Sequence, residues 1–114
     1  MPGKKSLGDY GERLASKYLA KKGYKIITTN YRTRYGEVDL ICAKAGQIIF
    51  IEVKTRTNLA FGQPEESIDQ RKLEKLNACA EIYMYNKNND WQIDAVSIII
   101  AGKKISIKHL QNIN

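Results

Sequence analysis

Two apolar runs joined by three residues constrain the fold of this chain most. The segment 37–43 (EVDLICA) and the segment 47–55 (QIIFIEVKT) are both rich in β-branched and other apolar residues, which is typical of strands buried in a sheet. Only Lys44, Ala45 and Gly46 separate the two segments, and a short connection that contains glycine joins neighbouring antiparallel strands. The sequence therefore predicts a β-hairpin that belongs to a larger sheet.

The rest of the chain predicts two helices and three further strands around this hairpin. Apolar residues at helical spacing predict helices over residues 6–22 and 68–86, and a capping box of Ser67 and Gln70 begins the second helix. A loop is expected over residues 56–66, and the remaining strands are expected over 24–31, 91–100 and 104–110. The predicted order is αβββαββ, a single α/β domain over residues 1–114 in which helices flank a mixed central sheet.

Charge is distributed unevenly along the chain, whose formal net charge is +7. Residues 1–34 hold nine Lys and Arg and only two acids, whereas residues 35–70 hold six acids and three basic residues. Basic flanks around an acidic centre are typical of a nuclease, in which carboxylates gather at a metal and cations hold the phosphate backbone. A charged, solvated surface without any ligand gives the same composition, so charge alone leaves both interpretations open.

Cysteine and histidine content excludes several classes of site. Cys42 and Cys79 belong to no C-x-x-C pair, and we expect both to be buried, reduced thiols. His109 is the only histidine, which excludes His-rich zinc sites and the Ser-His-Asp and Cys-His catalytic sets. The N-terminal segment lacks an apolar signal-peptide core, and no apolar run approaches the about 18 residues that a membrane helix needs. We therefore expect a cytoplasmic protein without a membrane partner.

Three ionisable side chains on the predicted hairpin form the candidate catalytic site. Glu52 and Lys54 are two residues apart on one strand, so they share a face with Phe50. Antiparallel pairing through the short turn brings Asp39 beside Ile51 or Glu52. Charged side chains at the end of an apolar face are costly unless they pair or coordinate an ion. A simple Glu–Lys pair at a sheet edge is the structural alternative, but the acid on the neighbouring strand favours a site.

The chemistry of these groups suits a divalent cation and a phosphodiester. Asp39, Glu52 and the backbone carbonyl of Val53 offer hard oxygen ligands for Mg²⁺ or Mn²⁺. Such an ion neutralises charge on the phosphoryl oxygens and makes hydroxide from bound water near neutral pH. Lys54 would orient the attacking water and stabilise the developing oxyanion. These residues predict metal-dependent hydrolysis of phosphodiester bonds.

The same strings resemble a known superfamily. GEVDLI (36–41) and IEVKTR (51–56) resemble the D-x(n)-E-x-K signature of the restriction-endonuclease-like nucleases, also written PD-(D/E)xK. With LGDYGERLASKYLAKKGYKII, NYRTRYGEVDLI, FGQPEESI and WQIDAV, the chain resembles the small YraN-like bacterial proteins over about residues 7–107. That family is mostly uncharacterised and is grouped by similarity with archaeal-type Holliday-junction resolvases. One departure is Val38, which stands where the superfamily signature often has proline.

The resemblance implies a restriction-endonuclease-like core and supports the roles of Asp39, Glu52 and Lys54. It also implies a supporting acid of the metal site on the first helix, which matches Glu12, although by itself Glu12 is a solvated helix residue. Glu37 is the alternative acid, because it shares a strand face with Asp39.

Further residues are expected to contact nucleic acid. The family pattern suggests that Lys72 reaches the site or a phosphate, whereas the alternative is an exposed helix lysine. The complete set of basic residues expected to bind nucleic acid is Arg13, Lys17, Arg32, Arg34, Arg56 and Lys72. Tyr31, Tyr35 and Trp91 could stack on unpaired bases, although aromatic residues on strands more often belong to the core.

The sequence thus predicts a Mg²⁺- or Mn²⁺-dependent endonuclease acting on DNA, either branched (Holliday-junction-like) or single-stranded. Two alternatives fit the same residues: a non-catalytic nucleic-acid-binding module of this fold, and a nuclease-like scaffold for a protein partner. The intact set of Asp39, Glu52 and Lys54 favours catalysis, because a binding-only protein has no need of acids that repel phosphate. We also expect a homodimer, because a junction has two symmetric strands to cut.

Overall fold

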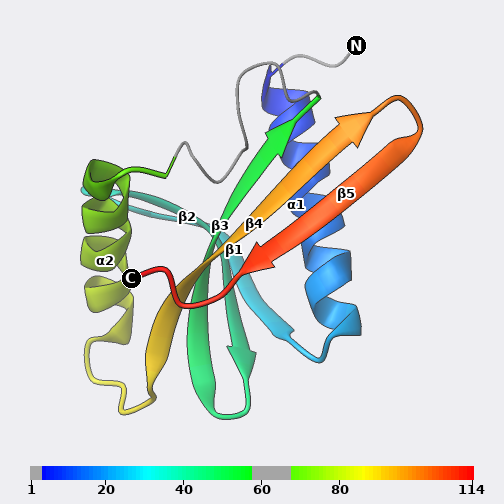
Figure 1. Ribbon diagram of the computed structural model, residues 1–114. Helices are drawn as coiled ribbons and strands as arrows, with labels where there is room; N and C mark the ends of the chain where they lie inside the picture. The colour runs from blue at the N-terminus through cyan, green and yellow to red at the C-terminus, as the bar shows by residue number, and fades with distance from the viewer. Residues whose placement is uncertain (1–3, 58–67) are drawn as a thin grey trace.

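A mixed five-stranded sheet with the strand order β1-β2-β3-β4-β5 forms the centre of the described part of the molecule (Figure 1). The computed structural model describes residues 4–57 and 68–114. Its elements are α1 (Lys4–Lys21), β1 (Lys25–Thr33), β2 (Gly36–Lys44), β3 (Gln47–Arg56), α2 (Gln70–Met84), β4 (Trp91–Ala101) and β5 (Lys104–Leu110). The order αβββαββ and the helix-flanked mixed sheet agree with the sequence prediction.

The predicted hairpin is the β2–β3 pair, and its register is the one that the short turn implies. Ala43 pairs with Ile48 and Leu40 pairs with Ile51 in an antiparallel ladder. Strands β1 and β5 also pair antiparallel with their neighbours, but β3 and β4 are parallel. Parallel neighbours need a crossover connection, and α2 lies in the segment between these two strands.

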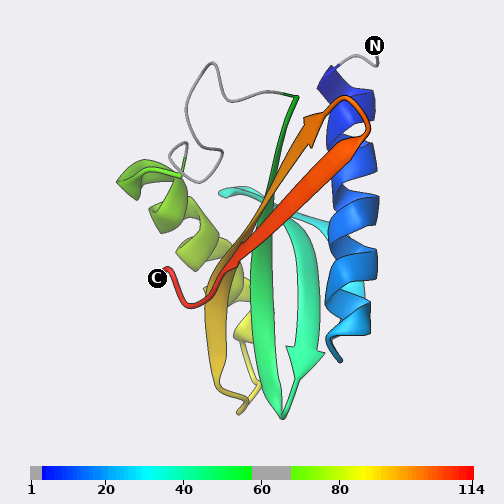
Figure 2. The ribbon, with the colours of Figure 1, turned by 45° about the vertical axis from the view of Figure 1, so that its right-hand side comes forward.

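The two helices cover opposite faces of the sheet (Figure 2). Ala15 and Leu19 of α1 belong to the core cluster that includes Ile51, whereas Leu76 of α2 belongs to the cluster that includes Phe50. Successive strand residues point to opposite faces, so β3 serves both cores at once. Full burial of a large apolar side chain such as Phe50 stabilises the fold by about 1.5–3 kcal/mol. No helix in the described ranges is long and apolar enough to cross a membrane.

Both cysteines are free and buried, as predicted. Burial raises the pKa of the Cys42 thiol to about 12. The thiolate is the reactive form of cysteine, so Cys42 stays protonated and chemically inert at neutral pH.

Helix α2 is capped by Asp69, and the predicted cap at Ser67 is wrong. Asp69 has an extended backbone, and its Oδ1 accepts a hydrogen bond from the Lys72 backbone N–H at 2.9 Å. This bond satisfies one of the amides that a helix N-terminus leaves free. Gln70, the predicted partner in the capping box, is the first helical residue. Ser67 itself and most of the loop predicted over 56–66 lie outside the described residues.

A glycine lets α1 approach the end of β3. Gly11 is buried, and a Cβ built on it would overlap Thr55 Oγ1 and lie 2.9 Å from Thr55 Cβ. Any larger residue would have to move either the helix or the strand. Glu12 follows Gly11 directly, so this close contact also fixes how near Glu12 comes to the acids of the sheet.

We expect Gly11→Ala to lower the free energy of unfolding by about 1–3 kcal/mol, because overpacking displaces well-packed neighbours. Urea denaturation followed by circular dichroism measures the change. Gly8→Ala on the same helix is the matched control, because nothing lies within 4 Å of a Cβ at that position. It should be neutral or stabilise the helix by up to about 1 kcal/mol. Equal stability of the two variants would contradict the close approach at Gly11.

Candidate active site

Strands β2 and β3 stop pairing where the predicted acids stand. The ladder between the two strands ends at the Leu40–Ile51 pair. Beyond that pair, the Asp39 side chain of β2 takes the place of a backbone hydrogen-bond partner for β3. Asp39 Oδ2 accepts a hydrogen bond from the Val53 N–H at 2.8 Å. Because the amide and carbonyl of a strand residue point to the same side, the Val53 carbonyl also faces β2. The Asp39 carboxylate and the Val53 carbonyl therefore both face the gap between β2 and β3 at this end of the ladder.

Glu52 is buried beneath the first turn of α2, with 3% of its surface exposed. Its Oε2 lies 2.8 Å from Lys72 Nζ and 3.6 Å from Lys54 Nζ. A buried carboxylate needs such partners, since an uncompensated buried charge is strongly destabilising. Burial would lower the pKa of Lys72, but the hydrogen bond and charge of Glu52 outweigh it and raise that pKa. Lys72 therefore reaches the site as an ammonium ion.

The environment of Asp39 disfavours its ionised form. Burial, with the nearby Glu52 charge as the second cause, raises the pKa of Asp39 to about 8, although the hydrogen bond from Val53 acts in the opposite direction. Strongly perturbed carboxylates in a pocket are concentrated at functional sites. A cation bound between the two carboxylates would favour their ionised forms.

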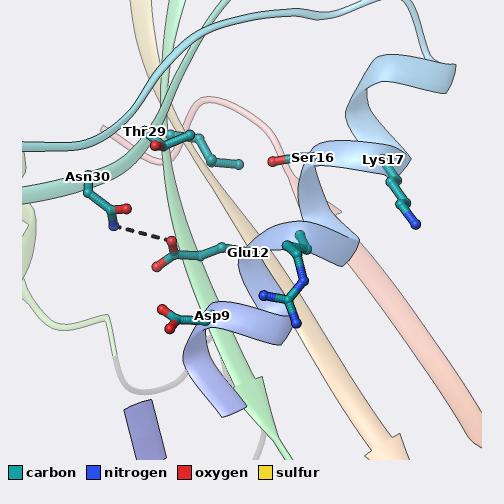
Figure 3. A pocket seen from close by; sticks show the side chains of 8 residues that line it. Asp9, Glu12, Ser16, Lys17, Thr29 and Asn30 are labelled. Carbon is teal, nitrogen blue, oxygen red and sulfur yellow. Dashed lines mark hydrogen bonds between the residues drawn. The ribbon is translucent and has the colours of Figure 1, made fainter. Parts of the chain in front are cut away.

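Glu12 lies on α1, close enough to Asp39 for each carboxyl group to affect the pKa of the other. Asn30 Nδ2 donates hydrogen bonds to Glu12 Oε1 at 3.2 Å and to Glu37 Oε2 at 3.4 Å. Asn30 has a φ of 51°, a left-handed conformation that asparagine tolerates better than most residues. Burial, with the charge of Glu37 as a further cause, raises the pKa of Glu12. Figure 3 shows Glu12 and Asp9 of α1 facing Asn30 of β1 in a pocket of about 420 Å³.

A second cavity, the acid pocket, contains the three predicted catalytic side chains and has a volume of about 330 Å³. Its lining residues are Tyr35, Gly36, Glu37, Asp39, Glu52, Val53, Lys54, Lys72, Lys75 and Leu76. Within residues 4–57 and 68–114, no three His, Cys, Asp or Glu side chains form a ready-made metal cage. Mg²⁺, however, is commonly held by one or two carboxylates together with water and substrate phosphate. Asp39, Glu52 and the Val53 carbonyl match that requirement.

The basic residues predicted to bind nucleic acid lie in different places. Lys72 lines the acid pocket, and sequence analysis missed Lys75, which lines it too and follows three residues later on the same helix face. Lys17 lines the pocket at Glu12, but its ammonium group points away from Glu12 (Figure 3). The other predicted residues are Arg13 in the Glu12 pocket, Arg32 paired with Glu37 at 2.6 Å, Arg34 beside Tyr35, and Arg56 at the end of β3.

A separate buried contact between an acid and a histidine lies outside the acid pocket. Asp94 is fully buried, and its Oδ2 lies 2.7 Å from His109 Nε2. Asp94 Oδ1 accepts hydrogen bonds from Gln92 and from the Asn112 backbone N–H. These bonds tie the C-terminal residues to β4, so Asp94 has the structural role that its position on a strand suggests.

We expect Asp39→Asn to stabilise the fold at alkaline pH. The pKa of Asp39 is about 8 in the folded protein against an ordinary value of 3.8, so folding favours the protonated carboxyl. That contribution to stability is complete below about pH 4 and is lost as the pH rises through about 8. Asparagine resembles the protonated carboxyl but does not titrate. Urea denaturation without divalent ions should show an advantage for Asp39→Asn near pH 8.5 that shrinks toward pH 4.

Asp94→Asn is the control for this comparison, because Asp94 is fully buried and its carboxylate has several hydrogen-bond partners. It should lower the stability at every pH in that range, since it removes the partner of His109. A constant difference between wild type and Asp39→Asn would contradict a raised Asp39 pKa.

Comparison with known proteins identifies relatives over almost the whole chain. A family described as "Uncharacterised protein family UPF0102" matches residues 11–98. The "UPF0102 protein" of Syntrophomonas wolfei is 44% identical over 111 residues, which cover 95% of this chain and 96% of that protein. The relative in Clostridioides difficile is 40% identical over 111 residues, with 95% and 96% covered. The relative in Rhodococcus opacus is 38% identical over 111 residues, with 94% of each chain covered.

Proposed function

We propose that this chain, which belongs to the uncharacterised protein family UPF0102, is a metal-dependent endonuclease that hydrolyses phosphodiester bonds in DNA. The observation that carries the proposal is the pair of neighbouring carboxylates, Asp39 and Glu52, in a pocket with Lys54 and Lys72. The charge of the buried Glu52 side chain raises the pKa of Asp39, so holding both side chains as charged carboxylates costs the fold stability. A cation bound by the two carboxylates would offset that cost, which is why the pair suits a metal site.

The proposal includes a restriction-endonuclease-like core. Two features support it: the order αβββαββ, and the position of Glu52 and Lys54 on β3, which pairs antiparallel with one neighbour and parallel with the other. Asp39 stands on the adjoining strand beside Glu52, as that signature requires.

The ionisable residues predicted to be catalytic have distinct tasks in this mechanism. Asp39, Glu52 and the Val53 carbonyl would hold Mg²⁺ or Mn²⁺, with Glu12 as a supporting acid that acts on Asp39. When bound, the ion neutralises phosphate charge and lowers the pKa of a coordinated water. Lys54 would orient that water and stabilise charge that develops on the phosphoryl oxygens.

Lys54 and Lys72 can exchange a carboxylate partner for a phosphate partner. Both contact Glu52, yet their side chains are 29% and 38% exposed, so the ammonium groups are reachable from the open side of the pocket. Phosphate oxygens accept strong charge-assisted hydrogen bonds from such groups. The same two lysines therefore stabilise the acids in the free protein and position the substrate in the complex.

A non-catalytic DNA-binding module is the second candidate, favoured only by the basic surface. It leaves Asp39 and Glu52 without a task, because both acids repel phosphate. The third candidate, a scaffold for a protein partner, likewise leaves the acid pocket unused.

Substitutions at Asp39 and Lys54 separate the two roles in the site. Asp39→Asn should weaken Mn²⁺ binding and abolish cleavage, because the ion loses a charged oxygen ligand. Lys54→Ala should retain Mn²⁺ binding but lower the cleavage rate by about 10²–10³-fold, the cost of removing one electrostatic contact to a transition state. Calorimetric titration with Mn²⁺ and a cleavage assay on branched, nicked and single-stranded DNA measure the two effects.

Asp90→Asn is the matched control, because it removes an exposed acid just before β4, at the other end of the sheet from Glu52. It should leave both ion binding and cleavage unchanged. Equal Mn²⁺ affinity of wild type and Asp39→Asn would remove Asp39 from the ion site. If wild type neither binds Mn²⁺ nor cuts any substrate, the non-catalytic module is the better description.

DNA binding should weaken steeply as salt rises, because cations on the protein displace counterions from phosphates. Arg13 and Lys17 are exposed on α1 beside the Glu12 pocket. Their joint replacement by glutamine should lower the slope of log affinity against log salt by about 2. Lys25 and Lys44 lie at the opposite end of β1 and β2, and the same double replacement there should leave the slope unchanged. Identical slopes for the two double variants would exclude α1 from the DNA contact.

A further inference from the structure

An exposed aromatic groove lies beside the acid pocket. Arg34 and Tyr35 of the β1–β2 turn form one wall, and Ile82 of α2 forms the other together with Tyr85, which caps the end of α2, around a volume of about 510 Å³. This volume is within the range of about 300–1,000 Å³ that is usual for ligand sites. Tyr85 is 76% exposed, Tyr35 43% and Ile82 41%. Large apolar side chains that gather on a surface in this way mark binding sites.

Tyr35 connects the groove to the acid pocket, because it lines both. The face of α2 is continuous too: Lys75 lines the acid pocket, whereas Ala78 and Ile82, three and seven residues later, line the groove. Lys75 and Ile82 are only about 10 Å apart along the helix axis. A nucleotide next to a phosphate held by Lys72 would therefore lie over Tyr35.

The Tyr35 ring is held in place before any ligand arrives. The Arg34 guanidinium lies 5.0 Å from the ring centroid, and Arg34 Nη2 donates a hydrogen bond to the Tyr35 hydroxyl at 2.9 Å. The Tyr35 backbone N–H donates to Thr33 Oγ1 at 3.0 Å. A fixed ring loses little freedom on binding, which favours affinity. Aromatic rings and Arg planes are the groups on which proteins stack unpaired bases.

The other two aromatic residues that the sequence suggested for stacking already have partners. Tyr31 packs edge-on against Tyr83, and Trp91 packs edge-on against Phe50. Both belong to the α2-side core. Tyr35 is therefore the member of that set whose ring remains available to a ligand.

The charges of the two cavities differ in a way that suits a nucleotide. The acid pocket carries Lys54, Lys72 and Lys75 at positions where a phosphate can bind. The groove instead carries one cation, Arg34, and one acid, Glu81, and the Glu81 carboxylate can accept hydrogen bonds from the amino group of a base. In a duplex, the faces of each base are covered by its stacked neighbours, so only an unpaired base can lie on Tyr35.

We infer that the groove formed by Arg34, Tyr35, Ile82 and Tyr85 binds an unpaired nucleobase next to the scissile phosphate. The substrate would then be DNA with a single-stranded nucleotide at the cut, as occurs in a single strand, a flap or an open junction. This inference rests on the proposed nuclease function and adds the selection of substrate.

Binding without metal tests the inference independently of cleavage. Fluorescence anisotropy in the presence of EDTA compares a labelled single strand with its fully paired duplex. Tyr35→Ala should weaken single-strand binding by about 5- to 150-fold, the cost of one lost stacking contact of about 1–3 kcal/mol. Duplex binding should change by less than about twofold, because phosphate contacts dominate it. Tyr35→Phe keeps the ring and should bind the single strand nearly as well as wild type.

Tyr10→Ala is the matched control, because Tyr10 is 37% exposed but lies on α1, away from the groove. It should leave both affinities unchanged. Equal losses for single strand and duplex in Tyr35→Ala would overturn the inference. So would a wild-type dimer in sedimentation that Tyr35→Ala converts to monomer, since the groove would then bind a second copy.

Further outcomes separate this inference from the proposed function. If wild type prefers the single strand through Tyr35 but cuts no DNA with Mg²⁺ or Mn²⁺, the base groove stands and the nuclease proposal fails. If wild type cuts DNA and Tyr35→Ala keeps the same preference between the two substrates, the nuclease proposal stands and the groove fails. Absence of any DNA binding by wild type overturns both.

Discussion

The buried carboxylate of Glu52 is the group on which the arrangement of the acid pocket depends. It lies at the end of the apolar face of β3, where a charge without partners would destabilise the fold. Lys72 meets this need from the first turn of α2, 2.8 Å away, and Asp69 caps the same turn. The ion pair thus fixes the start of the crossover helix against the sheet. Glu52 also affects Asp39: its charge adds to the effect of burial and disfavours ionisation of the Asp39 carboxyl.

The two faces of the sheet carry different features. On the α1 face, Gly11 allows a close contact with β3, and Asp94 with His109 ties the C-terminal residues to β4. On the α2 face, the acid pocket and the aromatic groove follow one another along a single helix. Glu12 links the faces, because it lies on α1 and interacts with Asp39, which lines the acid pocket. A helix that packs too loosely on either face would therefore alter the carboxylates as well as the core.

The proposed binding surface would contact the phosphate and the base of a nucleotide in two separate regions. Lysines beside the acids suit the phosphate, a charged group that binds cations strongly in any sequence context. The ring of Tyr35 and the apolar side chains of α2 suit the base, which is uncharged and flat. Glu81 lines the same groove and could accept a hydrogen bond from a base amino group. The proposed arrangement would select a substrate by the presence of an unpaired base.

The sequence by itself determined the order of the elements and the proximity of Asp39 to Glu52, because both depend on the residue pattern within single strands and on the length of one turn. A two-residue period puts alternate side chains on one face, and a short turn sets the register of a hairpin. Only the tertiary structure decided which residues beyond the hairpin join the site: Lys72, Lys75 and Tyr35. These contacts depend on how the crossover between two parallel strands lays α2 over the sheet, and no local pattern in the chain encodes that packing.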